Sequence, residues 1–201
     1  MIKGLKRLWL GAAEEAPADS PHITRVLMVC TANICRSPTA EAVLRAKLQR
    51  AGLHQQVVVD SAGTQGFHLA EAPDLRAQRA AALRGYDLSP LRARRMTPDD
   101  FFQHHHILAM DTTHLAWLQK RAPEGSAARL RLLMDHAPQF PDQAEVPDPY
   151  YGGPAGFERV LDLIEDACDG WLAQLQPPQS PKAAPSAEKR PAGDAIRRLD
   201  L

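Results

Sequence analysis

The fold of this chain is decided by one stretch of its sequence, Cys30-Thr31-Ala32-Asn33-Ile34-Cys35-Arg36-Ser37. The apolar run 23–29 precedes this stretch and the helix-like run 38–50 follows it. We therefore expect a buried strand, a short loop and a helix. In such a unit successive backbone N–H groups surround one point, with the positive end of the helix behind them. The stretch, here called the phosphate loop (residues 30–37), is predicted to bind a tetrahedral dianion.

Cys30 is the candidate nucleophile, because the positive field of the loop favours a thiolate over a thiol. The alternative is an inert cysteine that merely ends a buried strand. Pro38 falls where the first helical turn tolerates a missing N–H, and Ser37 is predicted to be the N-cap. Both features favour the strand, loop and helix arrangement, and with it the catalytic interpretation.

Three polar side chains of the loop have predicted tasks. Arg36 offers a planar fork that can hold two equatorial phosphate oxygens, although a solvated arginine at a helix start is the alternative. Ser37 is expected to direct its hydroxyl at the Cys30 sulfur, with helix capping alone as its alternative. Asn33 is expected to tolerate a left-handed backbone and to tie the loop together with its amide. The other loop residues are expected to contact substrate: Thr31, Ala32, Ile34 and Cys35.

A second segment, Asp148-Pro149-Tyr150-Tyr151-Gly152-Gly153, lies over a hundred residues downstream. Its spacing alone favours a turn built on Asp-Pro. The two tyrosines, together with Phe67, are expected to form the walls of a slot for a flat aromatic ring. A phosphoserine side chain would be too short to reach the phosphate loop through such a slot.

The two segments together resemble the low-molecular-weight protein tyrosine phosphatase family. The resemblance covers roughly residues 23–176 and extends through SAGT (61–64), LRARRMTPDDF (91–101), ILAMD (107–111) and GFERVLDLIEDAC (156–168). It implies hydrolysis of phosphotyrosine in proteins, and of small aryl phosphates, through a phosphocysteine intermediate. It further implies that Asp148 is the general acid and that Asp111 braces Arg36. Helix capping is the alternative role for Asp111.

Four positions depart from the pattern of that family. Ala32 stands where glycine is usual, Phe67 where tryptophan is common, Leu91 where a histidine often supports the loop, and His114 where asparagine is usual. None of the four is a reacting group. If position 32 requires a positive φ, the Cβ of Ala32 adds strain, and Leu91 removes a bracing hydrogen bond.

The length of 201 residues suits one catalytic domain with tails. We expect an extension at 1–21, a phosphatase domain at 22–176 and a disordered Pro- and Ala-rich tail at 177–201. The 24 acidic and 24 basic residues give no overall attraction to nucleic acid. No apolar run is long enough to span a membrane. An odd count of three cysteines favours a reducing compartment, and so the cytoplasm.

The patterns predict an α/β domain with a four-stranded parallel sheet flanked by helices on both faces. Ligands bind such sheets at the carboxyl ends of the strands, and Cys30 directly follows the first strand. The predicted strands are 23–29, 56–60, 105–110 and 129–133. The predicted helices are 38–51, 72–85, 112–121 and 155–175, with a shorter turn at 98–102.

No cofactor and no metal is expected. Three consecutive histidines at 104–106 would point to alternate faces of a strand, so they do not form a set of metal ligands. Arg92, Arg94 and Arg95 are interpreted as a solvated basic patch.

Two other functions have to be weighed against this one. An arsenate reductase uses a similar loop but passes oxidation along further cysteines, for which only Cys35 and Cys168 remain. A phosphoprotein-binding module without activity would not need Cys30, Arg36 and Asp148.

The expected partner is a phosphotyrosine protein. An arginine-rich composition hints at a bacterial source, and by family implication the partner is a bacterial tyrosine kinase. Cys35 is also expected to capture an oxidised Cys30 as a disulfide.

Overall fold

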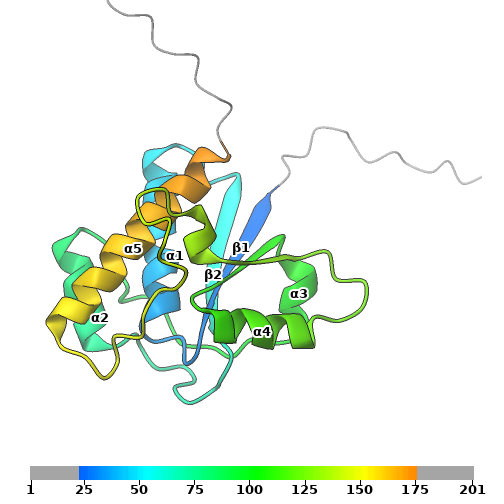
Figure 1. The fold of residues 1–201 in the computed structure, drawn as a ribbon, viewed down its shortest axis with the longest axis horizontal. Coiled ribbons are helices and arrows are strands. Elements are labelled where there is room, and N and C mark those ends of the chain that lie inside the picture. The colour runs from blue at the N-terminus through cyan, green and yellow to red at the C-terminus, as the bar shows by residue number, and fades with distance from the viewer. Residues whose placement is uncertain (1–22, 176–201) are drawn as a thin grey trace, which may run out of the picture.

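A computed structural model of the chain describes residues 23–175, so the predictions for 1–21 and 177–201 lie outside the described residues. Four parallel strands form one sheet in the order β2-β1-β3-β4 (Figure 1). Their bounds are β1 Thr24–Cys30, β2 Val57–Gly63, β3 His106–Ala109 and β4 Arg129–Leu132. The predicted number of strands and their parallel direction are confirmed.

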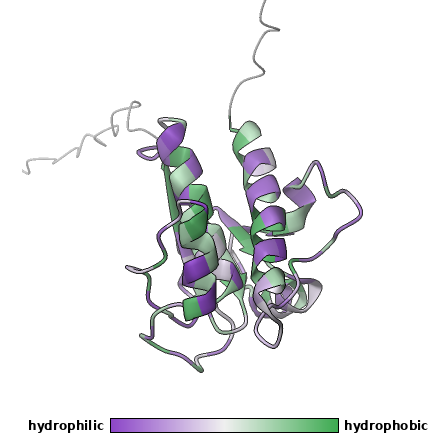
Figure 2. Ribbon diagram, turned by 90° about the vertical axis from the view of Figure 1, so that its left-hand side faces the viewer, coloured by the Kyte–Doolittle hydropathy of each residue, from purple (hydrophilic) through white to green (hydrophobic). Residues whose placement is uncertain are grey.

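Helices cover both faces of the sheet, as predicted. One face carries α1, α2 and α5, and the other carries α3 and α4 (Figure 1). The bounds are α1 Arg36–Arg50, α2 Leu75–Leu83, α3 Asp100–Gln103, α4 Thr112–Arg121 and α5 Pro154–Ala173, with a 3₁₀ turn η1 at Leu133–His136. In Figure 2 the helices carry both hydrophilic and hydrophobic residues, which is typical of helices that pack on a sheet by one side.

Strand β1 is the centre of the core. Val26 and Met28 belong to the cluster under α1 and α5, whereas Leu27 and Val29 belong to the cluster under α4. All four side chains are fully buried, because β1 has a sheet neighbour on each side and helices on both faces. A strand buried on both faces reads as a continuous apolar run, which is why the sequence pattern identifies it.

Most segment boundaries differ from the predicted ones by one to three residues, and the differences at α1 and α2 have a clear cause. Helix α1 begins at Arg36 with Cys35 as its N-cap, so Ser37 lies inside the helix and its predicted capping role is wrong. Helix α2 is shorter than predicted, because Pro73 precedes it and the Asp74 side chain caps it by accepting the Arg76 N–H at 2.8 Å. Within residues 23–175 no helix is both long and apolar enough to cross a membrane.

The histidine and arginine clusters have structural partners. His105 Nδ1 accepts the backbone N–H of Arg25 at 2.9 Å, and the ring of His106 packs edge-on against Trp171. The guanidinium of Arg94 binds Asp60 at 2.6 Å and Asp100 at 3.0 Å. The interpretation of Arg94 as part of a solvated patch is therefore wrong, since its side chain joins β2 to α3.

Candidate active site

The phosphate loop lies where β1 ends between β2 and β3. This position is the switch point of the sheet, because the chain leaves β1 for β2 on one side and later returns to β3 on the other. The buried Cys30 sulfur has two hydrogen-bonding neighbours at this point. Ser37 Oγ lies 3.0 Å from Cys30 Sγ, and the Asn33 backbone N–H donates to the sulfur at 3.3 Å. When the sulfur is ionised, both groups can donate to it.

Asn33 holds the loop in shape. Its φ of 59° is in the left-handed region, which asparagine tolerates better than most residues. Its side-chain nitrogen donates to Ser37 Oγ at 2.9 Å and to Ser61 Oγ at 2.8 Å. The predicted conformation and tying role of Asn33 both agree with this geometry. Ala32 is not in the left-handed region, so the strain expected from its Cβ is absent.

The amide of Asn33 also connects the loop to more distant elements. Its oxygen accepts the backbone N–H of Arg94 at 2.9 Å, which braces the loop although Leu91 cannot do so. Ser61 Oγ in turn donates to Glu41 Oε2 at 2.5 Å. Burial raises the pKa of Glu41, and hydrogen bonding from Ser61 opposes that shift. Cys30 is thus the end of a buried polar chain through Ser37, Asn33 and Ser61 to Glu41.

Arg36 is held by two carboxylates. Its Nη1 donates to Asp111 Oδ2 at 2.8 Å and to the Val146 carbonyl oxygen at 3.3 Å. Its Nη2 donates to Asp148 Oδ2 at 2.7 Å. The guanidinium is 5% exposed, so these bonds form in a poorly solvated place. The alternative of a solvated arginine at a helix start does not fit this burial.

Asp111 performs both of the tasks weighed for it. One oxygen binds Arg36, and the other caps α4 by accepting the His114 backbone N–H at 2.8 Å. Burial acts to raise the pKa of Asp111, but bonds from His114 and Arg36 outweigh it and hold the pKa well below its usual range. Asp111 therefore stays ionised and keeps Arg36 oriented.

Asp148 lies on a loop, residues 146–151, that is held from both sides. The Val146 N–H donates to the Met110 carbonyl at 2.8 Å, which ties the loop to the end of β3. Arg76 donates to the Tyr150 carbonyl at 2.9 Å, and its guanidinium lies over the Tyr150 ring. Asp148 Oδ1 accepts the Tyr150 N–H at 3.1 Å, so the turn predicted for Asp-Pro also forms. The Asp148 carboxylate remains 46% exposed beside Arg36.

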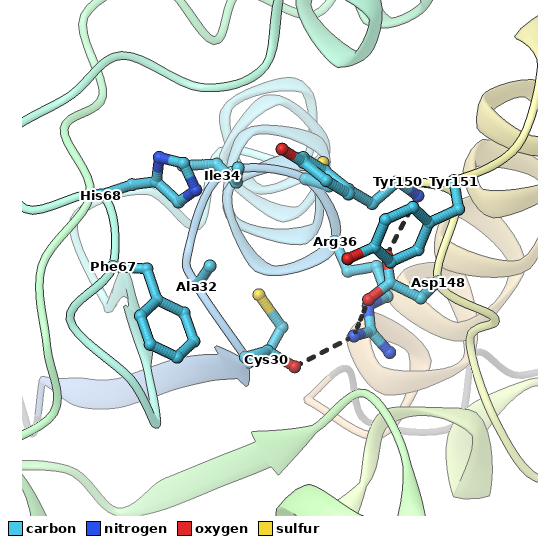
Figure 3. A pocket seen from close by; sticks show the side chains of 11 residues that line it. Cys30, Ala32, Ile34, Arg36, Phe67, His68, Asp148, Tyr150 and Tyr151 are labelled. Atoms are coloured by element: carbon cyan, nitrogen blue, oxygen red, sulfur yellow. Dashed lines mark hydrogen bonds and ion pairs between the residues drawn. The ribbon is translucent and has the colours of Figure 1, made fainter.

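These residues surround a cavity of about 310 Å³. Figure 3 shows Phe67 and His68 on one side of Cys30, with Asp148 and the tyrosines on the other. Phe67 is 71% exposed and Tyr151 is 96% exposed, so both aromatic rings stand at the rim. The cavity is lined by Cys30, Thr31, Ala32, Ile34, Cys35, Arg36, Phe67, His68, Asp148, Tyr150 and Tyr151.

All seven residues predicted to contact substrate line this cavity, as do Cys30, Arg36 and Asp148. Asn33, Ser37 and Asp111 lie behind it and bind the residues that line it. Sequence reasoning missed His68, Ser61, Glu41 and His114 as parts of the site. Signals for three of them were present: His68 follows Phe67, Ser61 opens the SAGT segment, and His114 is one of the departures from the family pattern.

The other two thiols are enclosed. Burial raises the pKa of Cys35 to about 12, and Asp74 adds to the shift. Cys168 on α5 is fully buried in the core, and burial also raises its pKa. A relay of oxidation to Cys168, which the arsenate reductase interpretation would need, would have to reach a thiol that lies in the core and does not line the cavity.

Comparisons with known proteins agree with this geometry. Residues 25–180 match the family model described as low molecular weight phosphotyrosine protein phosphatase. A low molecular weight protein-tyrosine-phosphatase of Streptomyces coelicolor is 44% identical over 162 residues, covering 80% of this chain and 98% of that protein. A human low molecular weight phosphotyrosine protein phosphatase is 36% identical over 149 residues, covering 73% and 92%.

Solved structures give the same answer for the fold. A crystal structure of a protein tyrosine phosphatase from Entamoeba histolytica, with Hepes in its active site, superposes with a TM-score of 0.73. It is 38% identical and covers 76% of this chain and 96% of that chain. The YfkJ structure from Bacillus subtilis has a TM-score of 0.71 at 34% identity, with 76% and 94% covered.

Proposed function

This chain belongs to the low molecular weight phosphotyrosine protein phosphatase family, and from that premise we propose that it hydrolyses phosphotyrosine in proteins, and small aryl phosphates, through a phosphocysteine at Cys30. The observation that carries the proposal is the surroundings of the Cys30 sulfur. The Asn33 N–H donates to it, the Ser37 hydroxyl contacts it, a helix begins behind it, and Arg36 lies in the same cavity. A thiolate beside an oxyanion site is what attack on a phosphate monoester requires.

In the first step the Cys30 thiolate attacks phosphorus, and an S–P bond forms as the P–O bond to the tyrosine ring breaks. Loop N–H groups and the Arg36 fork hold the equatorial oxygens and stabilise their charge in the transition state. Asp148 gives its proton to the leaving oxygen. Because Arg36 Nη2 binds Asp148 at 2.7 Å, the incoming dianion must replace that carboxylate on Nη2.

In the second step water attacks the phosphocysteine, Asp148 accepts a proton from that water, and thiolate leaves phosphorus. The Ser37 hydroxyl, 3.0 Å from the sulfur, stabilises the departing thiolate. Asn33 keeps that hydroxyl in place by donating to Ser37 Oγ at 2.9 Å. Asp111 keeps Arg36 oriented throughout, since it occupies Nη1 and leaves Nη2 for the ligand.

The shape of the cavity supports an aromatic phosphate as substrate. Phe67 lies on one side of Cys30 and the tyrosines on the other (Figure 3), so a flat ring can lie between them. The sulfur lies at the bottom of this slot, which a long phosphotyrosine side chain reaches and a short phosphoserine does not. As the phosphotyrosine-containing partner we propose a bacterial tyrosine kinase.

The state of the thiols supports two further proposals, a cytoplasmic location and a redox response. All three cysteines are free, as expected in a reducing compartment. Under peroxide, Cys30 becomes a sulfenic acid, and the Cys35 thiol condenses with it to a disulfide with loss of water. Thiol should then restore activity in the parent, and much less in Cys35→Ser. Equal recovery would remove Cys35 from the scheme.

The proposed function is tested with para-nitrophenyl phosphate and two loop variants. Cys30→Ser should abolish turnover yet still bind phosphate or vanadate, because the oxyanion site consists of backbone N–H groups and Arg36. Arg36→Ala should lose both turnover and binding. Appreciable turnover in purified Cys30→Ser protein would refute the covalent mechanism.

A further inference from the structure

A buried histidine lies beside Arg36 and has no part in the proposed mechanism. His114, in the first turn of α4, is 4% exposed. Its Nε2 lies 2.9 Å from the Thr31 hydroxyl oxygen, and its Nδ1 lies 2.8 Å from Asp111 Oδ1. An imidazole that touches both the phosphate loop and the partner of the catalytic arginine requires a physical account.

The contacts of His114 complete a closed ring of four residues: His114, Asp111, Arg36 and Thr31. Asp111 binds Arg36 Nη1 through its second oxygen at 2.8 Å. Arg36 Nη2 lies 3.4 Å from Thr31 Oγ1, the atom that also contacts His114. Of the four residues in the ring, Thr31 and Arg36 line the cavity, whereas His114 and Asp111 do not. The Thr31 hydroxyl is thus the direct link from the imidazole to the ligand site.

The positions of the protons in this ring follow from the contacts. His114 Nδ1 and Asp111 Oδ1 are close but are not aligned for a hydrogen bond. A proton on Nδ1 is still required, because two lone pairs facing each other at 2.8 Å would repel. With Nδ1 protonated, Nε2 is the nitrogen whose proton distinguishes the charged imidazole from the neutral one. Its state decides which partner donates in the contact with Thr31.

The two states leave the Thr31 hydroxyl hydrogen in different places. When the imidazole is neutral, Nε2 accepts, so the Thr31 hydroxyl hydrogen points at His114 and away from the cavity. When the imidazole is charged, Nε2–H donates to Thr31 Oγ1, and the hydroxyl hydrogen is free to turn into the cavity. An oxyanion there would meet one more donor in the charged state than in the neutral one.

We propose that His114 is a positioning residue whose protonation releases the Thr31 hydroxyl to donate to an oxyanion in the phosphate loop. The inference deepens the proposed function and rests on it only in taking that loop as an oxyanion site. Asp111, at the start of α4, is the charged group that faces the imidazole directly. Around Asp111 lie Arg36, which binds it, Asp148, which binds Arg36, and Glu145, which acts on both Asp111 and Arg36.

The test is the affinity for sulfate, measured by calorimetry at about pH 5 and about pH 8, which bracket the range where imidazoles titrate. Sulfate is a dianion at both pH values, so the ligand itself does not change. His114→Gln places a non-titrating amide near the position of Nε2. Thr31→Val removes the hydroxyl at constant shape, and Thr31→Ser keeps it. Thermal unfolding checks each variant, and His114→Asn replaces His114→Gln if the latter does not fold.

The compared quantity is the ratio of sulfate affinity at the lower pH to that at the higher pH. Other groups that titrate at the site contribute to this ratio in every variant. A hydrogen bond to a charged group is worth about tenfold or more in affinity, so the ratio in the parent should exceed that in His114→Gln by about tenfold. Thr31→Ser should match the parent, and Thr31→Val should fall towards His114→Gln.

Equal ratios in the parent and His114→Gln would overturn the proposal, because His114 would then have only a packing role. A parent-like ratio in Thr31→Val would also overturn it, because the charge alone and not the hydroxyl would be at work. Turnover of para-nitrophenyl phosphate is measured separately. An inactive parent that binds sulfate with the expected ratios would contradict the proposed function and support this inference.

Discussion

The phosphate loop and the acid loop, residues 146–151, meet at Arg36 but are built differently. The phosphate loop is buried, and its hydrogen bonds reach β2, α1 and the segment before α3. The acid loop has an exposed rim and is held by a few bonds: Arg36 and Arg76 donate to it, and its Val146 N–H donates to the Met110 carbonyl. The difference teaches that the proposed anion site is fixed in advance by buried hydrogen bonds, whereas the proposed general acid, Asp148, lies on an exposed loop with fewer bonds.

Removing the acid should give the largest effect, and one that depends on the leaving group. A phenolate whose parent pKa is about 10 leaves badly unless it is protonated, whereas a strongly acidic phenol leaves unaided. Asp148→Asn should slow phosphotyrosine hydrolysis by about 10² to 10⁴, the usual range of general acid catalysis, and slow an activated aryl phosphate much less. Burst kinetics on each substrate separates phosphoenzyme formation from its hydrolysis. The same loss in formation for both substrates would make Asp148 a loop-shaping residue.

Loosening the phosphate loop should affect stability and turnover together. Asn33→Ala removes the three bonds of the amide and places an alanine at a φ of 59°. We expect the free energy of unfolding to fall by about 1–3 kcal/mol for the groups left unpaired, and by about 1 kcal/mol more for the strain. Asn33→Gly is the matched control, since it loses the bonds but not the backbone conformation. If chemical denaturation finds both variants as stable as the parent, the loop is not held by Asn33.

Loosening the acid loop should affect turnover more than stability. Arg76→Gln removes the bond to the Tyr150 carbonyl and the cation over its ring, together with the pair that Arg76 forms with Asp74 and its contact with the Phe157 ring. The Arg76 side chain is 41% exposed, so the melting temperature should fall only slightly while kcat/KM for phosphotyrosine falls severalfold, mainly through KM. Arg76→Lys, which keeps the charge but not the fork, should fall in between. A lowered melting temperature with unchanged kinetics would mean that Arg76 stabilises the fold but does not position the acid loop for turnover.

The smallest expected effect is a pH dependence of the free energy of unfolding. Its source is Glu41, the last residue of the buried polar series that starts at Cys30. Burial raises the pKa of Glu41 above its ordinary value of 4.5, so the folded state binds this proton more tightly than the unfolded state. The stability contributed by Glu41 is therefore full below pH 4.5 and is lost as the pH rises through the raised pKa. Glu41→Gln should remove this slope. The check is the free energy of unfolding of parent and variant across that window, where parallel curves would exclude Glu41 as its source.

Much of the fold follows from local pattern. The apolar run before Cys30 predicts a strand buried on both faces, and the alternation of strands and helices predicts the parallel sheet. The strand order does not follow from pattern, because it depends on which crossovers pack together. The helix boundary at Ser37 was missed for a physical reason. Its hydroxyl contacts Cys30 and Asn33, so it is not available to cap the helix.

The residues of the site can likewise be divided into those that the sequence predicts and those that it does not. Cys30 and Arg36 are six residues apart on one loop, and local spacing is enough to pair them. The supports of that loop come from distant segments: Ser61 and Arg94 lie 28 and 61 residues from Asn33. His114 contacts Thr31 across 83 residues. Contacts at such separations depend on tertiary packing, so a single sequence names the reacting groups more readily than the groups that hold them.

The central claim is that Cys30 carries the phosphate during turnover, and trapping that phosphate tests it most directly. Asp148→Asn protein, in which hydrolysis of the intermediate is slowed, is mixed with an activated aryl phosphate and quenched during the burst. Digestion and mass spectrometry then locate the phosphate, with Cys30→Ser as the control. The account predicts about one phosphate per chain, bound through sulfur on the peptide that contains Cys30. A burst with no sulfur-bound phosphate, or with phosphate on another residue, would contradict it.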